Sequence, residues 1–153
     1  MRDRARCAAL GLVLVAACGL KSSPVAPELV QPSPPATVRA ASVHAGIRLS
    51  WRRPVRYTGG GRMRDLGGFE IERAATPTGP FARVERIDLT DQQRFRQQRE
   101  LEWTDPNVTP GEQYVYRVIS VTVDGDRSVP SPLVTIRHEP RAGAAEPAPR
   151  SVP

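Results

Sequence analysis

Few residues of this chain combine a reactive side chain with a spacing that would let them act together. The sequence contains two histidines, His44 and His138, at opposite ends of its central part, and we expect both to be exposed. Asp124 and Asp126 flank a glycine, which is typical of a tight turn rather than of a calcium site. The sequence therefore predicts no metal centre among these residues.

The remaining acidic residues and the glycine run give no catalytic pattern either. Glu70 and Glu72 alternate along a strand-like run, so we place both on its outward face and expect no buried pair of carboxylates. Gly59-Gly60-Gly61 lacks the Gly-Lys-Ser/Thr that cradles phosphates, and the chain has no G-x-S-x-G or H-E-x-x-H motif. We predict that the protein is not an enzyme and uses no cofactor.

The first residues of the chain are typical of an export signal. Arg2, Arg4 and Arg6 precede an uninterrupted small-apolar run from Cys7 to Ala17. That run is far shorter than the roughly 20 residues needed to span a bilayer, but it suits a secretory signal. The only cysteines are Cys7 and Cys18, so the folded part has neither a disulfide nor a thiolate metal site.

The signal ends in Val15-Ala16-Ala17-Cys18, which resembles the lipobox of bacterial lipoproteins. The resemblance implies cleavage between Ala17 and Cys18 and acyl chains on Cys18, and several chains together anchor a protein firmly. Gly19 follows the cysteine. In proteobacterial lipoproteins, a glycine at this position resembles the default signal for sorting to the outer membrane. We therefore expect the protein to be anchored in the outer membrane and to face the periplasm. The alternative is cleavage by the ordinary signal peptidase at Val15-x-Ala17, which would leave a soluble periplasmic protein with a free Cys18.

Two proline-rich segments flank the folded part. Residues 18–35 form a predicted tether, extended and semi-rigid, that would hold the domain roughly 50 Å from its anchor. The opening Cys18-Gly19-Leu20-Lys21 with Pro24 also resembles the C-G-x-K-G-P start of small outer-membrane lipoproteins, one of which assists the lipopolysaccharide-transport barrel. Ser22-Ser23 replaces the glycine of that pattern. Residues 139–153 are predicted to be a disordered tail.

The pattern of residues 36–138, which lie between these two segments, predicts a series of short strands separated by turns. We expect strands over 37–42, 47–51, 69–73, 81–87, 101–104, 114–121 and 133–137. Thr90-x-x-Gln93 could open a short helix as a capping box, or residues 90–100 could form a loop. Alternation along the strands predicts a core of Trp51, Phe69, Ile71, Trp103, Tyr114, Tyr116 and Val118.

Three features within this region resemble a fibronectin type III domain over about residues 35–138. They are Trp51, the run Val108-x-Pro110-Gly111-x-x-Tyr114, and Ser128-Val129-Pro130-Ser131. The resemblance implies an all-β, immunoglobulin-like sandwich of seven antiparallel strands. Tyr114 follows a turn at the start of a strand, so we expect a tyrosine corner, with its hydroxyl group bonded to the backbone upstream. The loops 52–68 and 88–100 are longer than typical for the family.

The first of these long loops is the predicted contact surface. If successive strands reverse direction, the tether, both long loops and the Asp124 turn lie at one end of the domain. Basic residues near an anionic surface are attracted to it by about 1 kcal/mol each. The candidate contact residues are Arg52, Arg53, Arg56, Tyr57, Arg62, Met63 and Arg64. The alternative is a solvated insertion whose arginine content reflects coding bias, since Lys21 is the only lysine.

The net charge and the predicted export together argue against a nucleic-acid-binding function. The formal net charge is +6, and removal of residues 1–17, with three arginines and one aspartate, leaves +4. Export keeps the protein away from nucleic acid. We predict a lipid-anchored envelope protein whose monomeric domain serves non-catalytic binding or scaffolding. One alternative is a partner of an outer-membrane assembly barrel that acts through its N-terminal segment. Another is an accessory carbohydrate-binding module, against which the scarcity of exposed aromatic residues counts.

Overall fold

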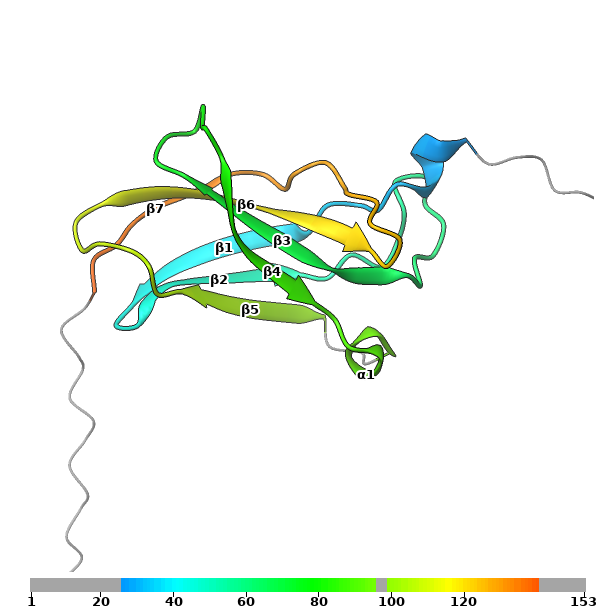
Figure 1. Ribbon diagram of the computed structural model, residues 1–153, viewed down its shortest axis with the longest axis horizontal. Coiled ribbons are helices and arrows are strands. Elements are labelled where there is room, and N and C mark those ends of the chain that lie inside the picture. Colours follow the sequence, from blue (N-terminus) through cyan, green and yellow to red (C-terminus); the bar gives the residue numbers. More distant parts are fainter. Residues whose placement is uncertain (1–25, 96–98, 141–153) are drawn as a thin grey trace, which may run out of the picture.

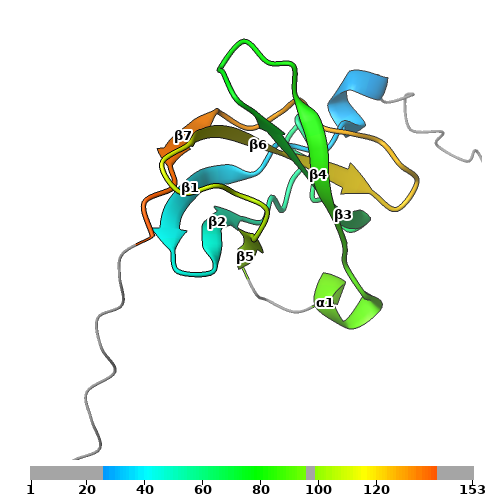
Figure 2. The ribbon, with the colours of Figure 1, turned by 60° about the vertical axis from the view of Figure 1, so that its left-hand side comes forward.

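The computed structural model describes residues 26–95 and 99–140. The predicted signal, the lipidation site Cys18 and the tail beyond 140 lie outside the described residues. The described part forms two antiparallel sheets stacked as layers (Figure 1; Figure 2). One sheet has the order β1-β2-β5 and the other the order β4-β3-β6-β7. Their bounds are β1 (Ala36–Val43), β2 (Gly46–Arg52), β3 (Leu66–Ala74), β4 (Ala82–Asp88), β5 (Glu100–Asp105), β6 (Gln113–Thr122) and β7 (Val134–Arg137).

The core lies between the sheets, where alternation along the strands placed it. Ile47, Leu49 and Trp51 of β2 are fully buried, and Trp51 meets Phe69 of β3 edge to face with ring centroids 5.4 Å apart. The other predicted core residues Ile71, Tyr116 and Val118 are also fully buried, whereas Trp103 and Tyr114 are half-buried against the core. Period-two patterning therefore identified the inward faces of β2, β3 and β6.

The two tyrosines of β6 have different roles. The Tyr114 hydroxyl group accepts a hydrogen bond from the Thr109 backbone N–H at 2.8 Å, which confirms the tyrosine corner. Tyr116 lies deeper and donates its hydroxyl proton to Asp105 at 2.9 Å. Burial and, to a smaller extent, this bond to Asp105 raise the pKa of Tyr116 well above its usual range. Asp105 also accepts bonds from Arg73 at 2.7 Å and from the Asn107 backbone N–H at 2.9 Å.

The segment after β4 contains a helix rather than only a loop. α1 (Asp91–Phe95) begins after Thr90. The Gln93 side-chain oxygen accepts a hydrogen bond from the Thr90 backbone N–H at 2.9 Å, and the Thr90 hydroxyl accepts one from the Gln93 N–H at 3.3 Å. These reciprocal bonds are those of a capping box, and they satisfy N–H groups that the first turn of a helix leaves free.

The prediction that no carboxylates are paired in a buried setting is wrong. Glu70 and Glu72 do lie on the outer face of β3, but they are only 4% and 9% exposed. Arg83 bonds Glu70 at 2.8 Å, Arg117 bonds Glu72 at 2.6 Å, and Arg127 reaches both at 2.7 and 3.0 Å. Long arginine side chains from neighbouring segments extend over the sheet and cover the glutamates.

The expectation of two exposed histidines is correct for His44 and wrong for His138. His138 is 4% exposed, with Nδ1 3.0 Å from the Ser42 hydroxyl oxygen of β1. Its backbone N–H donates to the Glu112 carbonyl, and its own carbonyl accepts from Gly111. Just after β7, the backbone of His138 therefore remains hydrogen-bonded to residues 111 and 112, which precede β6. This pairing places the imidazole beside Ser42 of β1.

The strand reversals gather the connections at two ends of the sandwich. One end, at the right of Figure 1, carries the 3-10 helix η1 (Pro27–Val30), the loop between β2 and β3, α1, and the turn after β6. This is the arrangement that the sequence predicts. The opposite end carries the β1–β2 turn and the β5–β6 loop. No helix within the described ranges is long and apolar enough to cross a membrane.

Candidate interaction surface at the N-terminal pole

We call the end formed by residues 29–33, 53–65 and 122–127 the N-terminal pole. Backbone and side-chain bonds join its three segments directly. The Val123 N–H donates to the Asp65 carbonyl at 2.8 Å, and the Gln31 side chain donates to the Arg127 carbonyl at 3.1 Å. The Thr58 N–H donates to the Gln31 carbonyl at 2.9 Å. Segments far apart in the sequence thus form one continuous surface.

The loop between β2 and β3 folds back on itself within this pole. Its tip is closed by the Tyr57 N–H, which donates to the Gly61 carbonyl at 2.8 Å, and by the Gly60 N–H, which donates to the Tyr57 carbonyl at 2.9 Å. Gly60 has a φ of 84°, which favours glycine. Farther down, the Met63 N–H donates to the Val55 carbonyl at 3.0 Å. The loop is therefore a small hairpin with a defined shape rather than an unstructured insertion.

The N-terminal segment packs along this hairpin. The Gly59 N–H donates to the Leu29 carbonyl at 3.1 Å, and Pro32 forms an isolated bridge with Tyr57. A Cβ atom on Gly59 would lie 2.7 Å from the Leu29 carbonyl oxygen, so this close approach requires glycine. The expectation of an extended tether as far as residue 35 is therefore wrong for residues 29–33. Backbone bonds make this contact, and apolar periodicity does not reveal such bonds.

Four of the seven predicted contact residues are available at the surface. Arg52, Arg56, Arg62 and Arg64 are exposed. Of these, Arg56 donates to the Gly60 carbonyl at 2.7 Å within its own loop. Their guanidinium groups can therefore meet an anionic surface or partner.

The other three predicted contact residues are engaged inside the domain. Arg53 donates to the carbonyls of Gln93 and Arg94 at 2.8 Å each, so it holds α1, and burial lowers its pKa. The Tyr57 hydroxyl donates to Asp65 at 2.6 Å, and that bond, more than burial, raises the pKa of Tyr57 to about 12. Met63 is 7% exposed and belongs to the core, so its assignment to the contact surface is wrong.

Sequence reasoning missed four aliphatic side chains on the same pole. Leu29, Val30 and Val55 are 50%, 47% and 57% exposed, and Val123, in the turn after β6, is 48% exposed. The adjacent Leu29-Val30 pair within a proline-rich segment was the available signal. It could be interpreted only once the structure showed that the segment lies against the arginine-bearing loop.

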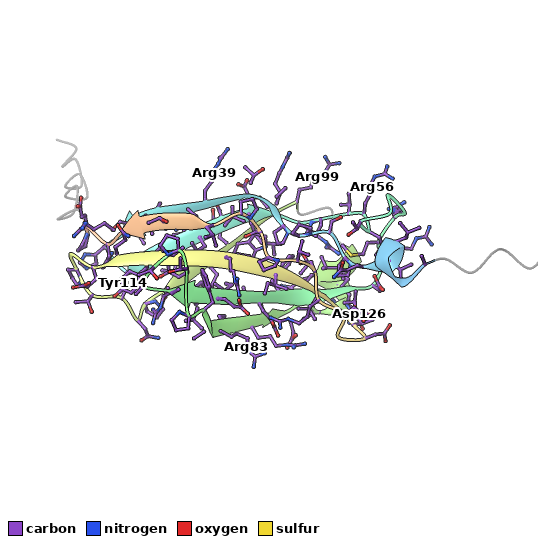
Figure 3. All side chains as sticks on the ribbon, turned by 90° about the horizontal axis from the view of Figure 1, so that it is seen from above. Arg39, Arg56, Arg83, Arg99, Tyr114 and Asp126 are labelled. Atoms are coloured by element: carbon purple, nitrogen blue, oxygen red, sulfur yellow. The ribbon has the colours of Figure 1, made fainter. Side chains whose placement is uncertain are left out.

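Charge is distributed unevenly around the pole. The exposed acidic residues Asp124 and Asp126 lie in the turn after β6. Figure 3 shows Arg56 and Asp126 on opposite sides of this end of the molecule. The pole therefore has one basic side, which also carries Leu29 through its contact with Gly59, and one acidic side.

A concavity lies at the end of the sandwich opposite the pole, with a volume of about 340 Å³. Its walls come from the β1–β2 turn, the β5–β6 loop and the residues that follow β7. They consist of His44, Ala45, Gly46, Pro106, Val108, Pro110, His138 and Pro140. Within the ranges 26–95 and 99–140, no three potential metal ligands of the His, Cys, Asp and Glu types lie together.

Comparison with other proteins identifies the fold. No family model matches the sequence, and no curated protein matches it. Among solved structures, the chain is similar to the twitchin kinase region from C. elegans, with 19% identity and a TM-score of 0.53 over 71% of this chain and 17% of that one. It is similar to a Fn3-like protein from Clostridium thermocellum, with 18% identity and a TM-score of 0.51 over 70% of this chain and 93% of that one.

Titin domains provide a third similar structure, with 22% identity and a TM-score of 0.51 over 71% of this chain and 32% of that one. The chain thus spans most of the Fn3-like protein from Clostridium thermocellum but only a small part of the twitchin and titin structures. At these identities the likeness concerns the fold. The described part of the chain is an immunoglobulin-like sandwich of the fibronectin type III kind, as the sequence predicts.

Proposed function

We propose that the protein is a lipid-anchored component of a bacterial cell envelope that displays one non-catalytic binding or scaffolding domain. The observation that carries this proposal is the Val15-Ala16-Ala17-Cys18 sequence after a charged and then apolar leader. The fibronectin type III-like fold supports the non-catalytic part, because such domains typically bind or space other proteins. Gly19 after the cysteine favours the outer membrane, with the domain in the periplasm.

The contact surface of this domain is the N-terminal pole, through its exposed arginines. The arginine-bearing loop has a defined shape, and it lies at the end where the chain enters the domain. A lipid on Cys18 would therefore hold this pole, rather than the opposite end, towards the membrane. Attraction by exposed guanidinium groups weakens as salt rises, so contacts made by this surface depend on ionic strength.

Anchoring is tested on the mature N-terminus. Mass spectrometry of the protein purified from membranes should find acyl chains on Cys18 as the first residue. Cys18→Ala should leave the protein unprocessed or release it from the membrane fraction. Cys7→Ala is the matched control because it removes the other cysteine without touching the cleavage site, and it should leave acylation unchanged. An unmodified first residue in the native protein would contradict the proposal.

A second candidate function is partnership with an outer-membrane assembly barrel through the N-terminal segment. It rests on the Cys18-Gly19-Leu20-Lys21 opening with Pro24. Residues 29–33 bind the domain itself, so residues 18–26 are the part left for such a partner. A pull-down with the intact lipoprotein, compared with a chain in which residues 19–25 are replaced by glycine and serine, separates the two functions. Loss of every partner on replacement would favour the segment, and retention would favour the domain.

The carbohydrate-binding alternative receives less support. Sugar-binding modules stack rings of aromatic side chains against the sugar. Among the residues whose exposure the structure describes, the large hydrophobic ones that are exposed are all aliphatic, namely Leu29, Val30, Val55, Val123, Val129 and Leu133. We therefore retain a protein or membrane partner as the proposed role.

A further inference from the structure

The packing of residues 29–33 against the domain shortens the predicted tether. The sequence alone gives a spacer from residue 18 to residue 35. The chain is instead bonded to the domain from Leu29 onward, since the Leu29 and Gln31 carbonyls accept bonds from Gly59 and Thr58. The Leu29 N–H also donates to the Ala26 carbonyl at 2.9 Å, so η1 fixes Ala26 beside the pole. Ala26 lies eight residues after Cys18, and eight fully extended residues reach at most about 29 Å. A lipid on Cys18 would therefore keep the N-terminal pole within that distance of the bilayer.

The surface that this short tether brings to the membrane has a mixed composition. Leu29, Val30 and Val55 are each about half exposed. They share the pole with the exposed Arg56, Arg62 and Arg64 of the adjacent hairpin. Exposed aliphatic residues among basic ones are characteristic of proteins that lie at a membrane interface, where the apolar groups enter the headgroup region and the cations attract anionic lipids.

Other parts of the molecule do not share this combination. The outer face of β3 and β6 is also rich in arginine, but Arg83, Arg117 and Arg127 bind Glu70 and Glu72 there. The concavity at the far end is lined mainly by proline and small residues, with His138 bonded to Ser42. Within the described ranges, exposed aliphatic groups, arginines without carboxylate partners and the entry of the chain coincide at the N-terminal pole.

We propose that the basic side of the N-terminal pole docks directly onto an anionic lipid bilayer. Arg56, Arg62 and Arg64 would lie over the headgroups, and Leu29, Val30 and Val55 would enter the interface. The acidic turn with Asp124 and Asp126 lies on the other side of this end and would face away from the lipid. This proposal builds on the proposed lipid anchor, but the surface itself should bind lipid without it.

The test uses the mature chain from residue 18 with Cys18→Ser, which cannot be acylated. Its binding is measured by sedimentation with vesicles of phosphatidylcholine containing one quarter phosphatidylglycerol, and with vesicles of phosphatidylcholine alone. We expect binding to the anionic vesicles that weakens strongly as salt rises. Replacement of Arg56, Arg62 and Arg64 by serine should lower the affinity about a hundredfold, since each arginine contributes roughly a fivefold factor.

A second triple variant serves as the matched control. Arg39, Arg48 and Arg137 are exposed on β1, β2 and β7, away from the pole. Their replacement by serine removes the same charge, and each triple includes one arginine that bonds a glycine carbonyl, Arg56 to Gly60 and Arg137 to Gly111. The control should retain vesicle binding within about threefold. Equal losses of vesicle affinity in both triple variants would show that binding depends only on net charge, and would overturn the proposal.

Insertion of the aliphatic side chains is measured separately. With Cys18→Ser the mature chain has no cysteine, so Val30→Cys or Arg39→Cys provides a single site for an environment-sensitive dye. A dye at position 30 should shift to the blue with anionic vesicles, whereas a dye at position 39 should not. No shift at either position, or no vesicle binding by the parent chain, would overturn docking and favour a protein partner instead. Acylation of Cys18 is decided independently, by mass spectrometry of the native protein.

Discussion

The arginines over the outer face of β3 and those of the N-terminal pole differ in what they bind, although a sequence makes them look alike. Arg83, Arg117 and Arg127 are bound to two glutamates that are almost fully buried. Arg56, Arg62 and Arg64 are exposed on a folded loop. The first set covers the sheet and belongs to the fold, whereas the second is free to meet something outside the molecule. An arginine bound to a buried carboxylate belongs to the fold, so the number of arginines alone does not identify a contact surface.

The largest effect on stability should come from the most buried arginine partner. Asp105 is 1% exposed and accepts bonds from Arg73, Tyr116 and Asn107. Asp105→Ala leaves these donors without their acceptor, and loss of one partner of a buried charged network costs about 3–5 kcal/mol. Chemical denaturation should show this as a large drop in the midpoint. A change below about 1 kcal/mol would indicate that the network contributes little to folding.

A smaller loss should follow when the two glutamates of the outer face are neutralised. Glu70→Gln with Glu72→Gln keeps the shape but weakens the bonds to arginines that are themselves partly exposed. Because bonds to charged groups contribute about 1.5–3 kcal/mol each when buried, and solvent reduces that value here, we expect a loss of about 2 kcal/mol. The same denaturation experiment measures it. An unchanged denaturation midpoint would show that these arginines, like those of the pole, are surface charges without a structural role.

Alkaline pH should weaken the hairpin of the pole through Tyr57. Its pKa is raised to about 12 by the bond to Asp65, compared with about 10 in the unfolded chain. The folded state therefore holds the phenolic proton more tightly. This contribution to stability is complete below pH 10 and is lost as the pH rises from 10 through 12.

Tyr57→Phe removes this titration and serves as the comparison. The variant should be less stable than the native chain near neutral pH, because it lacks the hydroxyl, and the difference should shrink between pH 10 and 12. Tyr116, whose pKa is also raised, titrates in both proteins and does not affect the difference. A difference that stays constant over this range would show that the Tyr57–Asp65 bond does not govern the titration.

The smallest effect on stability should come from the arginines of the pole itself. Replacement of Arg56, Arg62 and Arg64 by serine should change the free energy of unfolding by no more than about 0.5 kcal/mol, as is usual for exposed residues. The same variant is expected to lose most of its vesicle binding. If it unfolded readily, the pole arginines would be structural, and the contrast between the two sets would disappear.

The sequence predicted those parts of the molecule that depend on nearby residues. Period-two alternation identified the buried face of Trp51, Phe69 and Ile71, and the three-residue spacing from Thr90 to Gln93 indicated a helix start that the structure confirms. The tyrosine corner was also found, since Tyr114 reaches a backbone group only five residues away. Strand reversal then placed the long loops and the chain entry at one end.

The errors arose where the partner of a residue comes from elsewhere in the chain. His138 is buried because it packs beside Ser42 of β1. Glu72 is buried because Arg117 and Arg127 extend over it from β6 and the following turn. Leu29 and Gln31 join the domain through backbone bonds to the Gly59 hairpin, which leave no side-chain pattern. The candidate surface was therefore predicted in its charge but not in its aliphatic part or its short tether.

The most direct test of the account is the height of the domain above the membrane. Neutron reflectometry on the acylated protein, anchored in a supported bilayer with one quarter anionic lipid, measures the density profile along the normal. We predict that the protein layer begins at the headgroups with no water layer between them, and that the Arg56, Arg62 and Arg64 triple variant rises to the limit of its tether. A native protein layer separated from the headgroups by a water gap of about 20 Å or more, which lies within the roughly 29 Å that the short tether allows, would contradict direct docking.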